Sequence, residues 1–170
     1  MTEKYSCTID APFGTMYAFA ENGALIALSF TDEQFSGFAE NPDYPVFSAL
    51  RLWAADYFSG REPKTVPPLR PHGTPFQLEI WDMLLKIPYG KVVTYGELAE
   101  NCAKNRGIAK MSAQAVGGAV GRNPIAVIIP CHRVIGAGGN LTGYGGGLHL
   151  KLKLLELEGV VTSDMYFPVQ

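Results

Sequence analysis

A cysteine and a histidine are neighbours in Pro130-Cys131-His132-Arg133, between an apolar run and a stretch rich in glycine. Cysteine reacts as its thiolate, so a reactive thiol needs a base or a positive charge close by. His132 is a candidate base, although adjacent side chains of an extended chain point to opposite sides. A turn after Pro130, or a bridging water, would bring the two groups into proton-transfer reach. A carboxylate could orient the imidazole, but spacing along the chain does not choose which one.

The same residues could instead belong to a plain core, a zinc site or a phosphate-binding loop. A lone cysteine after an apolar run is most often a small buried hydrophobic residue. Three cysteines and three histidines without a Cys-x-x-Cys pair make a structural zinc site improbable, and we expect no metal. The glycine-rich stretch lacks the Gly-Lys-Ser/Thr ending of a phosphate-binding loop, and we expect no cofactor.

Composition is that of an ordinary globular protein of 170 residues, with 47% hydrophobic and 18% charged residues. The net charge of -2 argues against a strongly basic nucleic-acid binder. Residues 76–170 nevertheless hold nine Lys/Arg and seven Asp/Glu, which permits a polyanionic partner. Three scattered cysteines, no signal peptide and no long apolar run predict a cytoplasmic protein without membrane contact.

The first part of the chain reads as an α/β domain. Two apolar runs flank Asn22-Gly23, which predicts a hairpin because both residues tolerate positive φ. Apolar residues recur at helical spacing over residues 45–60, with Gly60 as the expected stop. Residues 61–75 then hold five prolines, which favours an extended linker and a domain boundary there.

The second part of the chain reads as mostly helical. Thr74 with Gln77, and Thr94 with Glu97, have the spacing of capping boxes that open two helices. Residues 125–129 read as a short buried strand or extended segment. The expected buried face of the first of these helices is formed by Phe76, Ile80, Trp81, Leu84 and Leu85. A last helix in residues 149–159 is expected to turn Leu150, Leu154 and Leu157 inward.

A third helix, capped by Ser112, is unusually rich in glycine and alanine. Gly117, Gly118 and Gly121 each cost about 1 kcal/mol relative to alanine inside a helix. Such a smooth helix packs closely against something. Tight packing against another helix is the commoner reason, and a recognition helix in a DNA groove, paired with the helix from Thr94, is the alternative.

Together these segments resemble one family. The stretch NPIAVIIPCHRVIG, with TYGELA and AQAVGGAVGRNP before it and GYGGGLHLKLKLLELEG after it, is similar to the O(6)-alkylguanine-DNA alkyltransferases. The similarity is dense over residues 75–160 and loose before them. It implies an α+β fold, with an N-terminal α/β (ribonuclease-H-like) domain in residues 1–70. A mostly helical winged helix-turn-helix domain with the active-site cysteine would follow in residues 75–170.

The resemblance also implies an activity. Members of the family take a methyl or small alkyl group from O(6) of guanine in DNA, with O(4) of thymine as a further candidate, onto their own cysteine. The transfer is irreversible, so each molecule acts once. The implied partner is double-stranded DNA containing alkylated guanine, and the implied state is a monomer.

The resemblance assigns roles residue by residue. Cys131 matches the alkyl acceptor, His132 the base acting through a water, and Glu158 the carboxylate that orients it. Asn123 matches the residue that ties the active-site segment to the preceding helix, and Tyr95 the phenol that protonates the leaving guanine. Substrate-binding positions match Val134, Tyr144, Gly145 and Lys151. DNA-binding positions match Thr94, Ala113, Gln114, Gly117, Gly118 and Arg122.

One departure and two rival functions remain. Gln114 stands where many members carry an arginine that fills the gap left by the flipped nucleotide. Glutamine brings no charge, so either flipping is less efficient or a neighbour such as Arg122 assists it. A protein that only binds the lesion would lack the acceptor cysteine, whereas Cys131 is present. A thiol hydrolase using Cys131 and His132 would need further chemistry for which the sequence offers no residues.

Overall fold

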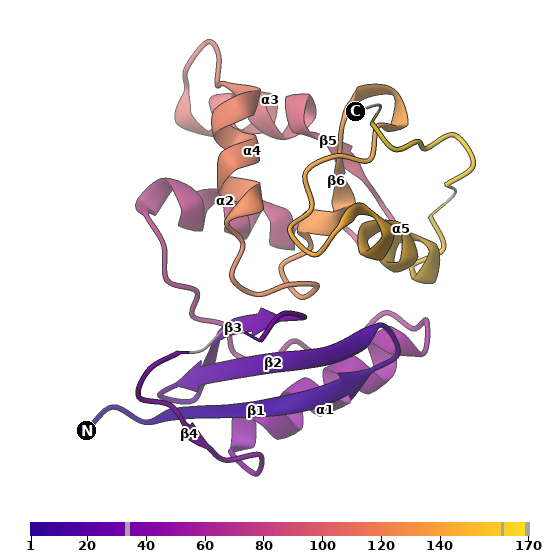
Figure 1. The fold of residues 1–170 in the computed structure, drawn as a ribbon. Coiled ribbons are helices and arrows are strands. Elements are labelled where there is room, and N and C mark those ends of the chain that lie inside the picture. The colour runs from indigo at the N-terminus through magenta and orange to yellow at the C-terminus, as the bar shows by residue number, and fades with distance from the viewer. Residues whose placement is uncertain (33–34, 161, 169–170) are drawn as a thin grey trace. The chain divides into compact units, whose positions relative to one another are not determined.

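The computed structural model describes residues 1–32, 35–160 and 162–168, which form a mixed α+β protein (Figure 1). The chain divides into two compact units. The first comprises Met1–His72 with Pro124–Ile128, and the second comprises Gly73–Asn123 with Ile129–Gln170. The sequence did not predict the return of residues 124–128 to the first unit. Within the described residues, no helix combines the length and apolarity needed to cross a membrane.

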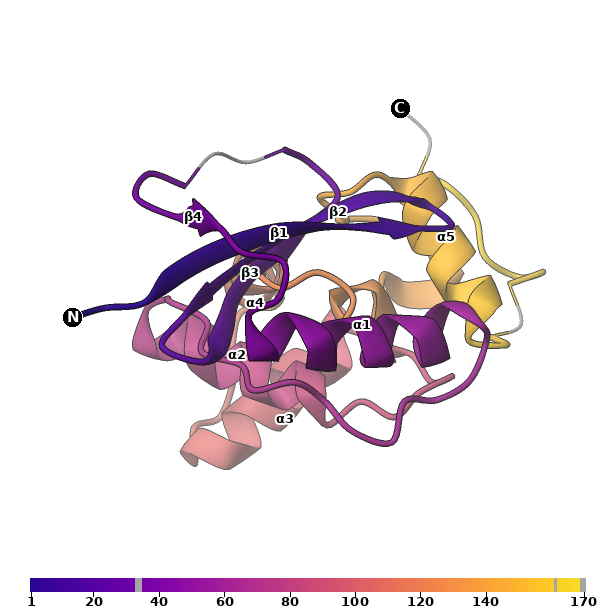
Figure 2. The ribbon, with the colours of Figure 1, turned by 90° about the horizontal axis from the view of Figure 1, so that it is seen from below.

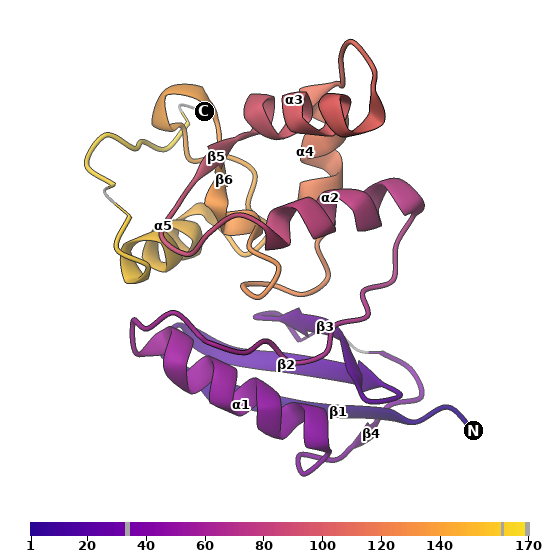
Figure 3. The same ribbon diagram turned by 180° about the vertical axis from the view of Figure 1, so that it is seen from behind.

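A sheet covered by one helix forms the first unit. In its described part, four strands pair in the order β3-β2-β1-β4. They are β1 (Lys4–Ala11), β2 (Gly14–Glu21), β3 (Ala24–Ser29) and β4 (Ala39–Glu40). The pairs β1/β2 and β2/β3 are antiparallel, and β4 is parallel to β1. The helix α1 (Pro45–Phe58) lies along one face of this sheet (Figures 2 and 3).

Both local predictions for this unit are confirmed. Asn22 and Gly23 join β2 to β3 with φ angles of 46° and 83°, the left-handed conformation that a tight hairpin turn requires. The side chain of Asn22 also accepts a hydrogen bond from the backbone N–H of Glu3 at 3.0 Å. The helix α1 ends before Gly60, as expected, and buries the predicted apolar residues Val46, Leu50, Trp53 and Tyr57.

The proline-rich segment is extended and binds the free edge of β3. The N–H of Leu25 donates to the carbonyl of Pro68 at 2.8 Å, and the N–H of Arg70 donates back to Leu25 at 2.7 Å. Proline has no backbone N–H, so this segment cannot form a full strand ladder. It pairs with the edge of the sheet through a single β-bridge, between Leu69 and Leu25.

The strand or extended segment predicted over residues 125–129 does not form. These residues form a turn, with one isolated bridge between Ile125 and Leu28, and Val127 has a φ of 69°. Their apolar side chains are buried without strand pairing because the segment folds back on itself beside β3. A short apolar run reports burial and does not distinguish a strand from a buried turn.

The second unit is built mainly of helices. Its helices are α2 (Pro75–Leu85), α3 (Tyr95–Arg106), α4 (Ala113–Gly121) and α5 (Leu148–Leu157). Two short strands, β5 (Val93–Thr94) and β6 (Val134–Ile135), pair in parallel. The 3-10 turns are η1 (Cys131–Arg133) and η2 (Ala137–Gly139).

Both capping boxes are confirmed at the starts of α2 and α3. Thr74 accepts from the N–H of Gln77, whose side chain accepts from the N–H of Thr74, and Thr94 and Glu97 do the same. The inward face of α2 is correct for Ile80, Trp81 and Leu84. Leu85 is exposed and Phe76 only partly buried, so these two assignments are wrong. The helix ends at Leu85, and the core continues instead with Ile87.

The glycine-rich helix α4 begins at Ser112, as predicted, and uses its small residues in two ways. Its inner side packs closely, because the indole N–H of Trp81 donates to the carbonyl of Ala119 at 2.9 Å. Gly118 and Gly121 face open space, with nothing within 4 Å of the position a Cβ would take. Packing against Trp81 therefore explains why a small residue stands at Ala119. The outer surface of α4, at Gly118 and Gly121, is smooth and exposed.

The helix α5 is rotated slightly from the predicted orientation. Leu154 is buried as expected, but Leu150 and Leu157 are only partly buried. The remaining buried residues of the helix are Lys151 and Leu155. A fully buried lysine on the inner face breaks the apolar pattern on which the prediction rested, and its burial indicates a specific polar environment.

Candidate active site

Cys131 begins the turn η1 and is 8% exposed. The N–H of Arg133 donates to the carbonyl of Pro130 at 3.0 Å, which closes this turn. The chain is therefore bent at Cys131 and His132, so the opposed directions expected for an extended segment do not apply.

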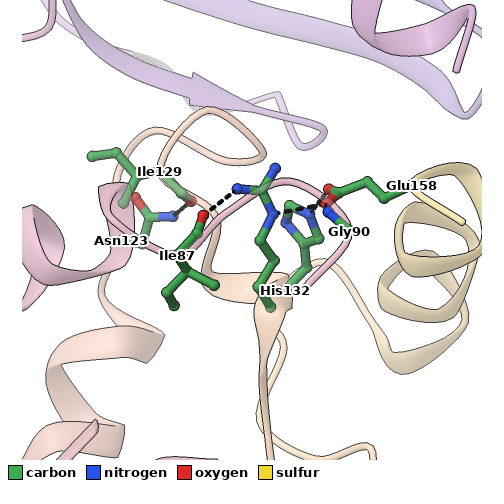
Figure 4. Close-up of polar contacts among 7 residues, drawn as sticks. Ile87, Gly90, Asn123, Ile129, His132 and Glu158 are labelled. Carbon is green, nitrogen blue, oxygen red and sulfur yellow. Dashed lines mark hydrogen bonds and ion pairs between the residues drawn. The ribbon is translucent and has the colours of Figure 1, made fainter. Parts of the chain in front are cut away.

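Asn123 binds the cysteine from the end of α4. Its amide nitrogen donates to the carbonyl of Ile129 at 2.7 Å (Figure 4). The same nitrogen donates to the sulfur of Cys131 at 3.2 Å. The chain leaves the second unit after Asn123 and returns to it at Ile129, so the first of these bonds joins the two ends of that excursion. One amide thus fixes both the path of the chain and the position of the sulfur.

His132 and Glu158 form a buried pair, although 26 residues separate them. Nε2 of His132 lies 2.5 Å from a carboxylate oxygen of Glu158, and both side chains are inaccessible to solvent. Figure 4 shows the imidazole and the carboxylate turned toward each other. An ionised carboxylate only accepts hydrogen bonds, so Nε2 carries the proton and Nδ1 is the basic nitrogen of the neutral ring.

The second carboxylate oxygen of Glu158 accepts two further hydrogen bonds. The backbone N–H of Gly90 donates at 3.0 Å and Nε of Arg133 at 2.8 Å. Arg133 also donates through its NH1 group to the carbonyl of Ile87 at 2.8 Å. Neither Arg133 nor Gly90 was predicted from the sequence to have a role, although Arg133 belongs to the motif that identified the site.

Burial determines the charges of the cysteine and histidine. It raises the pKa of the Cys131 thiol, against the hydrogen bond from Asn123 and the positive charge of Lys151. It lowers the pKa of His132, against the pull of Glu158. At neutral pH the Cys131 thiol and the His132 imidazole are therefore both neutral. The thiol is a potential nucleophile, and the neutral imidazole is the base that it requires.

The carboxylate keeps its charge in spite of its burial. Burial disfavours the ionised form of Glu158, but the hydrogen bonds from His132 and Arg133 and the positive charge of Arg133 outweigh it and lower its pKa to about 2. Glu158 is therefore an acceptor at every pH at which the protein would work.

Tyr95, Lys151 and the carbonyl of Thr142 form a second polar cluster. The Tyr95 hydroxyl donates to Thr142 at 3.1 Å, and the Lys151 ammonium donates to the same carbonyl at 2.8 Å. Lys151 also donates to the carbonyl of Val134 at 2.5 Å. Lys151 thus links Val134, before the glycine-rich segment, to Thr142 within it. Thr142 was not predicted from the sequence to belong to the site.

The charges of this cluster respond to Cys131. Burial lowers the pKa of Lys151 to about 8, while a negative charge on Cys131 would raise it. Burial raises the pKa of Tyr95 to about 12, and the charge of Cys131 adds to that shift. Burial likewise raises the pKa of Tyr144, again with a contribution from Cys131. Both phenols therefore stay protonated near the sulfur and are potential proton donors.

The predicted DNA-binding residues lie on α4, at its C-terminal end and at the start of α3. Ala113, Gln114 and Gly118 are exposed on α4, and Arg122 is exposed at its C-terminal end. Gly117 faces the ring of Tyr95, whose nearest atom is 3.7 Å from the position a Cβ would take. Thr94 caps α3 directly before Tyr95. The smooth surface of α4 thus adjoins the phenol of the candidate site.

The arrangement can perform one kind of chemistry without an added group. The site combines a soft sulfur nucleophile, a histidine–carboxylate pair that can act as its base, and protonated phenols whose charge state responds to Cys131. This set suits displacement at an alkyl carbon with proton donation to the leaving group. Among the described residues, no cluster of three or more His, Cys, Asp or Glu side chains could hold a metal ion.

Comparisons with known proteins point to the same chemistry. A family model described as 6-O-methylguanine DNA methyltransferase, DNA binding domain, matches residues 75–160. The chain is 41% identical over 171 residues to the methylated-DNA–protein-cysteine methyltransferase of Haemophilus influenzae, covering 96% of this chain and 91% of that protein. It is 42% identical over 164 residues to the Mycobacterium leprae protein of the same name, covering 94% and 96%.

Solved structures are similar over both units. Mycobacterium tuberculosis OGT in complex with DNA has a TM-score of 0.80 at 39% identity, covering 95% of this chain and 94% of that one. The O6-methylguanine methyltransferase of Mycobacterium tuberculosis has a TM-score of 0.78 at 38% identity, covering 98% and 96%. The mixed α+β fold is therefore shared along nearly the whole chain.

Proposed function

This chain belongs to the methylated-DNA–protein-cysteine methyltransferase family, and from that premise we propose that Cys131 is the residue that receives the alkyl group. The protein repairs DNA by direct reversal, transferring an alkyl group from the DNA to one of its own cysteines. Its donor is O(6)-alkylguanine in double-stranded DNA. Each molecule reacts once, because the described residues of the site include no group that would cleave the resulting thioether.

The observation that carries the assignment is the environment of Cys131. All three cysteines lie in the described residues and are free. Cys7 is a sheet residue in the first unit, and burial raises the pKa of its thiol to about 11. Cys102 lies in α3 with its sulfur 3.6 Å from a carboxylate oxygen of Glu79, which disfavours a thiolate. Only Cys131 stands beside a histidine–carboxylate pair.

The transfer follows from these positions. Nδ1 of His132 takes the thiol proton through a water, while Glu158 holds the opposite nitrogen. The thiolate attacks the alkyl carbon, forming the carbon–sulfur bond as the bond from that carbon to O(6) breaks. The electron pair stays on the guanine, which takes a proton from the Tyr95 hydroxyl and remains in the DNA as neutral guanine. The proton taken up by His132 balances the one that Tyr95 gives away. Asn123 keeps the sulfur in place throughout.

Access to the base requires the nucleotide to leave the duplex. We assign α4 to the DNA groove, where Ala113, Gly117 and Gly118 allow close approach of the backbone. Gln114 fills the gap left by the extruded nucleotide, and Thr94 and Arg122 contact the flanking DNA. The base enters a pocket formed by Val134, Tyr144 and Gly145, next to Lys151.

The finer architecture follows the same family. We assign residues 1–70 to a ribonuclease-H-like domain and residues 75–170 to a winged helix-turn-helix domain, in which α3 and α4 are the two helices. Three free cysteines are consistent with a reducing, cytoplasmic location. The protein acts as a monomer.

Mass spectrometry tests the assignment directly. The protein is mixed with a duplex containing O(6)-methylguanine, digested, and its cysteine peptides are compared with those from an unmodified duplex. A gain of one methylene on the Cys131 peptide is expected, with the Cys7 and Cys102 peptides unchanged. Methylation of another cysteine, or of none, would contradict it.

A further inference from the structure

Arg133 and His132 share one carboxylate. His132 lies against one oxygen of Glu158 at 2.5 Å, and Arg133 donates to the other at 2.8 Å. The Glu158 side chain is fully buried, and that of Arg133 is 11% exposed. In so dry a setting the guanidinium and the carboxylate interact strongly, and the imidazole next to them responds to the charge of both.

A buried histidine beside a lone carboxylate tends to take up a proton, because an opposite charge within hydrogen-bond distance favours the imidazolium. An imidazolium has no free electron pair with which to accept the thiol proton. The carboxylate that orients His132 would therefore also disable it as a base. A second cation on the same carboxylate removes this tendency by compensating the negative charge.

The charged and titratable groups around the imidazole are few. Glu158 follows α5, Lys151 projects from within α5, and Arg133 and Cys131 flank His132 in η1. Glu158 favours the imidazolium, whereas Arg133 and Lys151 oppose it. Burial and these two cations together leave the pKa of His132 below its ordinary value.

We propose that Arg133 is a positioning residue of the transfer reaction: by sharing Glu158 it keeps His132 neutral and ready to accept the thiol proton. This inference rests on the proposed function for its effect on rate. It adds to that function a reason why the motif holds an arginine directly after the histidine.

The surroundings of Arg133 require an arginine. One edge of the guanidinium donates to Glu158 and another to the carbonyl of Ile87, and its carbon lies 5.7 Å from the centre of the Tyr89 ring. A lysine could supply the charge but could not make both bonds from a fixed plane. In the same turn, the N–H of Gly90 donates to the Glu158 carboxylate. A Cβ at Gly90 would come within 3.1 Å of the backbone carbonyl oxygen of Glu158. The turn of residues 87–90 thus anchors the guanidinium.

The test separates charge from support of the fold. Single-turnover methyl transfer from an O(6)-methylguanine duplex is measured from pH 5 to 9, with protein in excess, for the natural protein, Arg133→Gln and Arg133→Lys. In Arg133→Gln the acid limb of the pH–rate profile should move up by about one pH unit. The loss of rate should approach about tenfold at the most acid pH measured, where both limbs descend, and it should shrink as the pH rises until the two rates converge.

Arg133→Lys keeps the positive charge, so the acid limb of its pH–rate profile should stay in place. Its rate should be lower than that of the natural protein by a similar factor at every pH. Arg106→Gln is the matched control, since it removes another arginine–carboxylate pair of the second unit, with Glu79, and should leave the limb unmoved. If Arg133→Gln lowers the rate by one factor across all pH values, the arginine only supports the fold and the proposal fails.

A second measurement does not depend on a stable variant or on transfer. Nitrogen NMR of the natural protein, with labelled histidine, should show His132 neutral at pH 6, with the proton on Nε2. Imidazolium signals at that pH would overturn the proposal. A protein with neutral His132 that never methylates Cys131 would instead remove the proposed function, so the two failures are distinguishable.

Discussion

The hydroxyl of Tyr95 lies against the backbone of Gly143. A Cβ at Gly143 would come within 2.6 Å of that oxygen, and Gly143 has a φ of 74°. The hydroxyl donates to the carbonyl of Thr142 at 3.1 Å and lies 3.3 Å from that of Gly143. The absence of a side chain at Gly143 therefore determines where the proton-donating phenol sits.

Gly143→Ala is expected to slow transfer by displacing this hydroxyl. Tyr95→Phe, which removes a general acid, should lower the rate about 100-fold, and Gly143→Ala about tenfold. Single-turnover rates of the natural protein, the two single variants and the double variant are compared in a double-mutant cycle. The double variant should be no slower than Tyr95→Phe, because the alanine acts through the hydroxyl. If the fold-loss of rate in the double variant equals the product of the two single losses, Gly143 acts independently of Tyr95.

Cys131→Ser should abolish transfer and preserve DNA binding, because a serine hydroxyl is far less nucleophilic than a thiol at neutral pH. Transfer of a radioactive methyl group and binding of an unmodified duplex are measured on the same preparation. Cys7→Ser and Cys102→Ser are the controls and should keep the natural rate. A comparable loss in either control would place the acceptor elsewhere.

Glu158→Gln should slow transfer, because a neutral amide holds the Nε2–H of His132 more weakly. It should also lower the free energy of unfolding by about 3 kcal/mol, since Arg133 loses its buried counter-charge. Urea unfolding and single-turnover rates measure the two effects. Glu156→Gln, which changes an exposed glutamate two residues earlier in the chain, is the matched control. An unchanged transfer rate in Glu158→Gln would remove this carboxylate from the mechanism.

The stability of the protein should depend on Glu158 at acid pH. Its pKa is about 2 in the folded protein and 4.5 as the ordinary value, so the unfolded chain binds the proton first. The stabilisation is complete above pH 4.5 and is lost as the pH falls toward 2. The difference in urea midpoint between the natural protein and Glu158→Gln should therefore narrow over this interval. A difference independent of pH would contradict the assigned pKa.

Gln114→Ala should slow transfer from a duplex more than transfer from the free alkylated base. The side chain matters only when a stacked nucleotide must be expelled. Gln114→Arg should leave the free-base rate unchanged and hold or raise the duplex rate. Both rates are measured at two salt concentrations, with duplex affinity expected to fall steeply as salt rises, because phosphate contacts release counterions. Equal losses on both substrates in Gln114→Ala would mean that the residue supports the fold or pocket.

Local features of this protein were determined by the sequence alone. The hairpin at Asn22-Gly23 and the capping boxes at Thr74 and Thr94 were predicted correctly because each depends on residues at most three positions apart. The conformations and hydrogen bonds involved lie within one turn of chain. The motif around Cys131 was equally local, and it indicated the chemistry before any fold was known.

Apolar runs were a weaker guide to structure. Residues 125–129 are buried, as their composition indicated, but they form a turn. Leu85 is exposed although it continues an apolar stretch, and Lys151 is buried although its charge argued against it. Burial of a side chain depends on which surface faces it across the core, and that surface comes from distant parts of the chain.

The composition of the polar site was decided by the tertiary structure. Spacing along the chain could not choose a carboxylate for His132, and only the family resemblance named Glu158, 26 residues away. Nothing in the sequence showed that Arg133 and the N–H of Gly90 would bind that same carboxylate. These contacts join the turn after α2, the turn η1 and the end of α5. Their geometry exists only once the helices have packed, because a hydrogen bond requires atoms to meet within about 3 Å.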